Sequence, residues 1–216
     1  MKKLWLLIPF LLCVSAPAMA DMTTFMEGLN YEAVTPAQQT DVKPGQIEVI
    51  EFYWYGCPHC FALEPYVEAW EKAGLPKDVV FKRVPGAMKD SQFYVDAQAT
   101  FTADVLGIGE KIREPFFNAI HFDGRDSLRF DKAAIRDFFG NYGVKPADFD
   151  AAWDSPAVQA DLLAAQKLGE RYQLTGVPVI IVNGKWKTGA GYGMQSADLI
   201  RCIQFLIDKE RAASSK

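Results

Sequence analysis

The stretch that decides the fold runs Ile47-Glu48-Val49-Ile50-Glu51-Phe52-Tyr53-Trp54, then Tyr55-Gly56, then the tetrad Cys57-Pro58-His59-Cys60. The first eight residues are apolar on both faces of an extended chain, with Glu51 as the exception, which is typical of a strand covered on two sides. The ten residues that follow the tetrad, 61–70, have a helical pattern. A strand, a turn and Cys-x-x-Cys at a helix start is the setting in which a thiolate becomes reactive. The tetrad is therefore interpreted as a redox dithiol.

The position of Cys57 at a helix start has a direct chemical consequence. The first amides of a helix lack intrahelical partners and carry a partial positive charge, so they stabilise an anion placed on them. Pro58 suits the first helical position, where its missing N–H costs nothing. His59 is a second potential cation, although an exposed polar residue without a role is the alternative. Both features favour the thiolate of Cys57.

The N-terminal residues have the pattern of a secretory signal peptide. Met1-Lys2-Lys3 is positively charged, residues 4–14 are apolar, and Ala18-Met19-Ala20 is a small-x-small cleavage signal before Asp21. The apolar stretch is too short for a membrane span, which needs about 20 residues, so a retained anchor is the weaker alternative. We expect residues 1–20 to be removed after Ala20 and the protein to work in the periplasm, where disulfides persist.

Charge and cysteine content narrow the class of protein. The chain has 216 residues and a formal net charge of −4, which becomes −6 if Lys2 and Lys3 are removed with the signal peptide. An acidic protein of this kind does not favour nucleic acid or an anionic membrane as a partner. The remaining cysteines are Cys57, Cys60 and Cys202. Cys202 shares a helix face with Leu199 and Leu206, which favours a buried apolar role, with a mixed disulfide as the alternative.

The rest of the chain alternates between strand and helix patterns, which predicts an α/β protein. A possible strand at 31–34, the central strand at 47–54 and a strand at 79–84 come first, and a strand at 179–182 follows a long helical stretch. Asn183-Gly184 is a strong hairpin signal before a return strand at 185–187, and a helix at 197–211 closes the chain. Helical patterns occupy the middle of the chain, at 93–106, 109–120, 131–139, 147–153 and from 156 onward.

With these elements in order, the chain resembles the DsbA family of bacterial thiol:disulfide oxidoreductases. The resemblance is carried by Cys57-Pro58-His59-Cys60 after an apolar strand, by Thr175-Gly176-Val177-Pro178 before the next strand, and by the Asn-Gly hairpin. It implies a thioredoxin-like fold with an inserted helical domain. The expected division is a signal peptide at 1–20, thioredoxin-like parts at 21–87 and 169–216, and a helical insertion at 88–168.

The resemblance also implies roles for residues outside the tetrad. Val177-Pro178 matches the family's cis-proline loop beside the dithiol, which presents backbone to an extended substrate; a strand-start proline at a sheet edge is the alternative. Glu51 matches a buried carboxylate that relays protons near the inner cysteine, whereas a solvent-facing Glu is the plain alternative. Its basic partner is expected on the next strand, and the sequence leaves Lys82 and Arg83 both open.

The implied activity is donation of the Cys57–Cys60 disulfide to newly secreted, cysteine-containing proteins. Cys57 would be the attacked sulfur and Cys60 the buried resolving thiol, with a mixed disulfide on Cys57 as the intermediate. The family implies recharging by a membrane oxidase of the DsbB type. No cofactor or metal is expected, and nothing in the sequence requires more than a monomer. Five residues could line a groove that binds unfolded chains, although ordinary core is the favoured interpretation of each one: Phe52, Trp54, Tyr55, Phe61 and Met194.

Three alternatives to this function remain. A periplasmic isomerase or reductase would use the same dithiol, but the 26 residues at 21–46 are too few for the N-terminal dimerisation domain that such isomerases usually carry. A structural zinc would need two more ligands, and Cys202 and His121 lack the required spacing. A redox-independent peptide-binding chaperone is the non-enzymatic option. His121 itself has no partner motif and is interpreted as a surface or core residue of the insertion.

Overall fold

The computed structural model describes residues 25–88 and 92–214. The predicted signal peptide at 1–20, with its cleavage after Ala20, lies outside the described residues. Within the part of the chain that is described, no helix is both long enough and apolar enough to cross a membrane.

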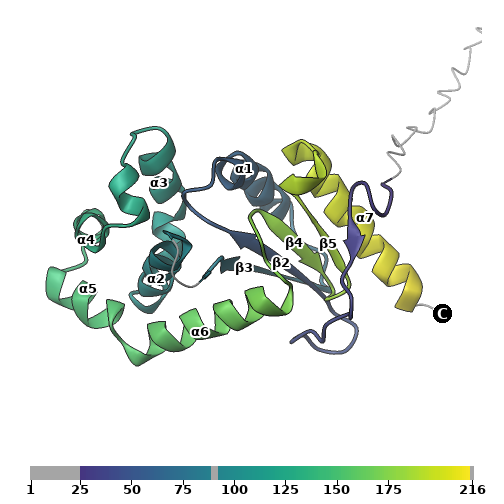
Figure 1. Cartoon of the computed structure of the whole chain (residues 1–216), viewed down its shortest axis with the longest axis horizontal. Coiled ribbons are helices and arrows are strands. Elements are labelled where there is room, and N and C mark those ends of the chain that lie inside the picture. The colour runs from purple at the N-terminus through teal and green to yellow at the C-terminus, as the bar shows by residue number, and fades with distance from the viewer. Residues whose placement is uncertain (1–24, 89–91, 215–216) are drawn as a thin grey trace, which may run out of the picture.

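A five-stranded mixed sheet forms the centre of the molecule (Figure 1). Its order is β1-β5-β4-β2-β3; β2 and β3 run parallel, and the other neighbours pair antiparallel. The predicted strands are confirmed, and their bounds are Glu32–Ala33, Ile47–Tyr53, Val79–Pro85, Val179–Val182 and Trp186–Gly189 for β1 to β5. All seven residues of β2 are buried, as its apolar pattern on both faces predicts. In the β4–β5 connection, residues 183–185, Asn183 and Gly184 have φ values of 52° and 66°, the left-handed conformation for which an Asn-Gly turn is favoured.

The helices divide into two groups. α1 and α7 contact each other, and α7 also contacts β4 and β5, so both belong to the sheet. The other five follow β3 and precede β4, and Figure 1 shows α6 leading back from α5 to the sheet. The bounds of α1 to α7 are Pro58–Lys72, Gln92–Val105, Gly109–His121, Lys132–Gly140, Pro146–Trp153, Pro156–Arg171 and Ser196–Ser214. This is a thioredoxin-like fold with a helical insertion; the predicted end of the insertion at 168 falls inside α6, and the exact domain limits stay a prediction.

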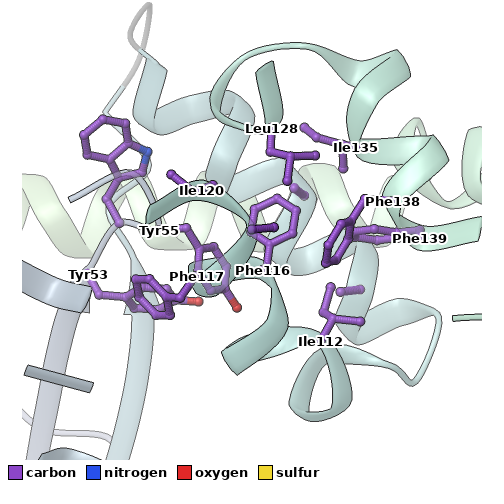
Figure 2. Packing of buried hydrophobic residues seen from close by; sticks show 14 of the residues in the cluster. Tyr53, Tyr55, Ile112, Phe116, Phe117, Ile120, Leu128, Ile135, Phe138 and Phe139 are labelled. Carbon is purple, nitrogen blue, oxygen red and sulfur yellow. The ribbon is translucent and has the colours of Figure 1, made fainter. Parts of the chain in front are cut away.

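The largest hydrophobic cluster joins the insertion to the segment that carries the tetrad. It includes Cys57 and Cys60 together with apolar residues of α3, α4 and α5. Figure 2 shows Tyr53 and Tyr55, at the end of β2 and just beyond it, packed beside Phe116 and Phe117 of α3. The ring centroids of Tyr55 and Phe117 are 4.6 Å apart. The redox segment is therefore packed against the insertion and not only against the sheet.

A buried ion pair reinforces this junction. Arg113 of α3 forms a bidentate pair with Glu64 of α1, with 2.7 Å between Nη2 and Oε2. The guanidinium carbon also lies 4.3 Å from the centre of the Tyr53 ring. Both charged side chains are less than a tenth exposed. Because a charge left alone in such a site is costly, the two residues should depend strongly on each other.

Replacing Arg113 alone should therefore destabilise the protein more than replacing both partners. We expect Arg113→Met to lower the free energy of unfolding by about 3–5 kcal/mol, since it leaves buried Glu64 with only the more distant Arg83, 3.7 Å away, and Arg113→Met/Glu64→Leu to recover at least half of that loss. Urea unfolding at pH 7 measures both. Arg136→Met, which breaks a half-exposed pair with Asp150, is the control and should cost less than about 1 kcal/mol. Equal losses in the single and double variants would contradict this account.

Candidate active site

Cys57 occupies the N-cap position of α1. Its φ and ψ of −88° and 118° are extended, and its Sγ accepts a hydrogen bond from the Cys60 N–H at 3.4 Å. The Cys57 N–H donates to the Trp54 carbonyl at 3.0 Å, which closes the turn between β2 and the helix. Pro58 takes the first helical position, as predicted. The chain thus places a sulfur atom where the unpaired amides of a helix converge.

The two thiols differ in access to solvent. Cys57 is 6% exposed and Cys60 is fully buried, while Pro58 and His59 between them are exposed. Both cysteines are free thiols in this structure. The predicted order, with Cys57 outside and Cys60 inside, is confirmed. An incoming sulfur atom therefore reaches Cys57 first.

The pKa values of the two thiols are shifted in opposite directions. The hydrogen bond with the Cys60 side chain, supported by the amides of residues 59 and 60 and by the charge of His59, lowers the pKa of Cys57 from the usual 9 to about 6 against an opposing effect of burial. Burial and the neighbouring Cys57 raise the pKa of Cys60 well above the usual 9. Near neutral pH the pair consequently holds one thiolate, on Cys57, and one proton, on Cys60.

The loop before β4 completes the site beside Cys57. The Val177–Pro178 peptide bond is cis, so the predicted geometry is confirmed. The Val177 carbonyl oxygen lies 3.4 Å from the Cys57 Sγ and accepts the hydrogen bond of the protonated thiol. Pro178, His59 and Met194 line one cavity of about 280 Å³, which reaches the surface next to the tetrad.

Glu51 lies in the interior and is fully buried. The question of its basic partner is settled: Arg83 Nε is 3.5 Å from Glu51 Oε2, whereas Lys82 pairs with Glu48 at 2.6 Å. Burial raises the pKa of Glu51 to about 7, although the charges of Arg113 and Arg83 act in the opposite direction. Glu51 also contributes to the raised pKa of Cys60, so the two groups interact electrostatically.

Three of the five candidate groove residues are core residues, which is the interpretation that the sequence favours for each of them. Phe52 is completely buried and packs on Tyr172, with ring centroids 6.0 Å apart, on the sheet face away from α1. Trp54 and Tyr55 are buried in the cluster shared with the insertion. The core interpretation is confirmed for these three residues. Phe61 and Met194 are only partly buried, in agreement with a surface role.

His121 and Cys202 are the histidine and cysteine that the structure describes outside the tetrad. His121 is a half-buried residue of the insertion at the end of α3, in agreement with the sequence interpretation, and it also contacts the active site: its Nε2 is 2.7 Å from the Tyr55 carbonyl oxygen, and its ring stacks on Phe61. Cys202 is fully buried, and burial raises the pKa of its thiol to about 11, so the buried apolar role is confirmed. No group of three or more potential metal ligands occurs in residues 25–88 and 92–214.

The fold and the paired thiols define a thioredoxin-like thiol:disulfide oxidoreductase. A family model described as the DSBA-like thioredoxin domain matches residues 78–201. The thiol:disulfide interchange protein DsbA of Pseudomonas syringae pv. tomato is 39% identical over 187 residues, covering 87% of this chain and 85% of that protein. The chain therefore belongs to the DsbA family, and its activity is thiol:disulfide oxidoreduction.

Solved structures agree with this assignment. The crystal structure of Pseudomonas aeruginosa DsbA superposes with a TM-score of 0.80 at 33% identity, covering 89% of this chain and 97% of the other. The oxidoreductase DsbA from Xylella fastidiosa gives a TM-score of 0.76 at 31% identity, covering 85% and 96%. The similarity thus spans the sheet, the tetrad and the helical insertion together.

The raised pKa of Glu51 makes a pH-dependent prediction. Between pH 4.5 and about 7 the unfolded chain loses the Glu51 proton while the folded protein keeps it, so this residue stabilises the fold at low pH and that contribution is lost as the pH rises through 7. Glu51→Gln should therefore be more stable than the wild type at pH 8, by up to about 3 kcal/mol, with the difference shrinking toward zero near pH 4.5.

Denaturant unfolding of the two proteins from pH 4.5 to 8 measures this difference. Glu48→Gln on the same strand is a matched control, because Glu48 has a close partner in Lys82 and its loss should destabilise the protein instead. A Glu51→Gln effect that is the same at every pH would contradict the assignment of a buried, protonated carboxyl.

Proposed function

We propose that this protein donates its Cys57–Cys60 disulfide to newly secreted proteins in the periplasm. The observation that carries the proposal is the opposite shift of the two thiol pKa values at the start of α1. A stable thiolate on Cys57 favours the reduced dithiol and so makes the disulfide a better oxidant. The signal-peptide pattern at residues 1–20 supports the compartment.

The reaction proceeds in two exchanges of one disulfide bond. A client thiolate attacks the Cys57 sulfur, which breaks the Cys57–Cys60 bond and forms a mixed disulfide on Cys57. A second client thiolate attacks the client sulfur of that bond, and Cys57 leaves as a thiolate. The client is oxidised by two electrons, and the enzyme holds the dithiol. Cys60 takes up a proton as it becomes a thiol, and Glu51, with its pKa about 7, is the proposed donor and acceptor for that proton.

The size of the thiolate effect depends on pH. With a pKa of about 6 in place of 9, the Cys57 thiolate stabilises the reduced form by about 1.4 kcal/mol at pH 7, or about 30 mV in reduction potential. This stabilisation is complete above pH 9, decreases as the pH falls, and is absent below pH 6. The disulfide is thus a stronger oxidant in neutral than in acidic solution, relative to a dithiol with ordinary pKa values.

The surface beside Cys57 supports binding of unfolded chains. The cavity next to the tetrad is lined by His59, Pro178 and Met194. The partly exposed Phe61 follows the tetrad directly. We propose that the Val177–Pro178 loop presents backbone groups to an extended client segment there. We further propose a monomeric enzyme that is recharged by a membrane oxidase of the DsbB type.

Two alternatives involve the same thiols or the same surface. An isomerase would use Cys57 and Cys60 as well, but it would rearrange disulfides that the client already has instead of forming new ones. A redox-independent chaperone would not require the Cys57 thiolate, although Phe122, 75% exposed beside Phe61, offers an apolar contact for a client in either case. Both thiol-exchange functions require Cys57, and a chaperone does not, so a Cys57 variant distinguishes an enzyme from a chaperone.

The two cysteines should give different products with a reduced, unfolded client. We expect Cys60→Ala, first loaded with glutathione on Cys57, to form a mixed disulfide with a client that has a single cysteine, and this bond should persist because neither Cys60 nor a second client thiol is present to attack it. Cys57→Ala should form no covalent complex and should lose oxidation of the client, because Cys60 is fully buried. Non-reducing electrophoresis and mass spectrometry identify the linked residues.

Cys202→Ser, a third cysteine variant, is the control and should oxidise the client at the wild-type rate. Full client oxidation by Cys57→Ala would contradict the mechanism. Chaperone activity that survives in Cys57→Ala, together with no oxidation of the client by the wild type, would favour the chaperone.

A further inference from the structure

Both backbone polar groups of Tyr55 are bound by side chains of the helical insertion. The Tyr55 N–H donates to Asp96 Oδ2 of α2 at 3.2 Å, and the Tyr55 carbonyl lies 2.7 Å from His121 Nε2 of α3. A carbonyl oxygen only accepts, so His121 Nε2 must carry the proton of this bond. Tyr55 is 4% exposed and Asp96 is fully buried, so water is not a ready substitute for either partner.

His121 also contacts the other end of the tetrad. Its ring stacks on Phe61 with centroids 4.6 Å apart and planes 10° from parallel. Phe61 follows Cys60 directly, and its N–H donates to the Cys57 carbonyl at 3.0 Å. One histidine therefore holds the residue two positions before Cys57 and the residue directly after Cys60. The aromatic ring of Tyr55 is fixed as well, packed beside Phe116 and Phe117 in Figure 2.

We propose that Asp96 and His121 are positioning residues for the thiol chemistry of Cys57. They control the reactivity of Cys57 by holding the backbone N–H and carbonyl groups of Tyr55. We name this pair of hydrogen bonds the Tyr55 clamp. The inference deepens the proposed function, because it rests on the Cys57–Cys60 exchange described above. It assigns to the insertion a direct part in setting the reactivity of the dithiol, in addition to covering it.

The backbone between the Tyr55 clamp and the Cys57 sulfur is short and conformationally flexible. Only Gly56 separates Tyr55 from Cys57, and a residue without a side chain restricts the backbone least. A side chain is excluded there, because a Cβ atom on Gly56 would lie 2.3 Å from the Trp54 ring. The position of the Cys57 sulfur must then be fixed from elsewhere. Its hydrogen bond from the Cys60 N–H, 3.4 Å long, needs the sulfur to stay in line with that amide, so a displacement of Cys57 would weaken it.

The surroundings of Asp96 suggest which substitutions test the clamp. Asp96 is also near Arg113 and Arg129, and burial raises the pKa of its carboxyl to about 8. A largely neutral carboxyl is well mimicked by an amide, so Asp96→Asn keeps an accepting oxygen and Asp96→Leu removes it. At the other bond, His121→Phe keeps an aromatic ring on Phe61 and loses the donor, whereas His121→Gln keeps a donor and loses the ring.

The experiment measures the Cys57 pKa from thiolate absorbance at 240 nm and the dithiol equilibrium with glutathione at pH 7. We expect His121→Phe and Asp96→Leu to raise the Cys57 pKa by about half a unit or more, and to lower the preference for the reduced form about threefold, equivalent to about 14 mV. Asp96→Asn should remain close to the wild type, and His121→Gln should be shifted less than His121→Phe. In the double variant the two effects should not add, because both bonds hold the same residue, through the peptide groups on the two sides of the Tyr55 Cα.

The outcomes that overturn the proposal are distinct from a failure of the proposed function. Folded His121→Phe with the wild-type Cys57 pKa and the wild-type equilibrium would overturn it, even if the protein were less stable, since the residue would then be only structural. A larger shift in His121→Gln than in His121→Phe would also overturn it. Asp123→Asn, an exposed change beside His121, is the control and should alter neither quantity. A wild-type Cys57 pKa near 9 would instead contradict the proposed function itself.

Discussion

Hydrogen bonding of the Cys57 sulfur with Cys60, through its side chain and its backbone N–H, is the interaction on which the rest of the site depends. It forms because Cys57 is the N-cap of α1, where amides have no partner within the helix. A sulfur at that position is stabilised as an anion, and the buried Cys60 is then left as the thiol. Because the Cys57 thiolate is stabilised, the reduced dithiol is favoured over the Cys57–Cys60 disulfide. A disulfide donor requires this property.

The helical insertion shapes this site as much as the sheet does. Tyr55 is buried between Phe116 and Phe117, and Glu64 of the active-site helix is neutralised by Arg113 of α3. The same arginine lowers the pKa of Glu51 against the effect of burial. Insertion helices thus influence the outer thiol through packing and the inner thiol through charge. The exposed side of the tetrad stays open at His59 and the Val177–Pro178 loop.

The local features were predictable from the sequence, and the long-range ones were not. The tetrad, the strands and the Asn183-Gly184 turn each have a pattern within a few residues. The partner of Glu51 depends on register: Arg83 is directly opposite Glu51 in the β2–β3 ladder, and the sequence does not specify that alignment. His121 contacts Tyr55 from 66 residues away, and no spacing or motif marks such a contact. For Phe52, Trp54 and Tyr55 the sequence left a groove open beside the favoured core, because an apolar side chain has the same character in both.

The reduction potential of the Cys57–Cys60 pair tests the central claim most directly. The purified mature protein is equilibrated with glutathione buffers at pH 7, and the oxidised and reduced forms are quantified. The account predicts a potential well above that of thioredoxin, about −270 mV, and toward about −120 mV, where DsbA itself lies. A value at or below about −270 mV would contradict it, because the dithiol would then serve as a reductant that needs its own source of electrons.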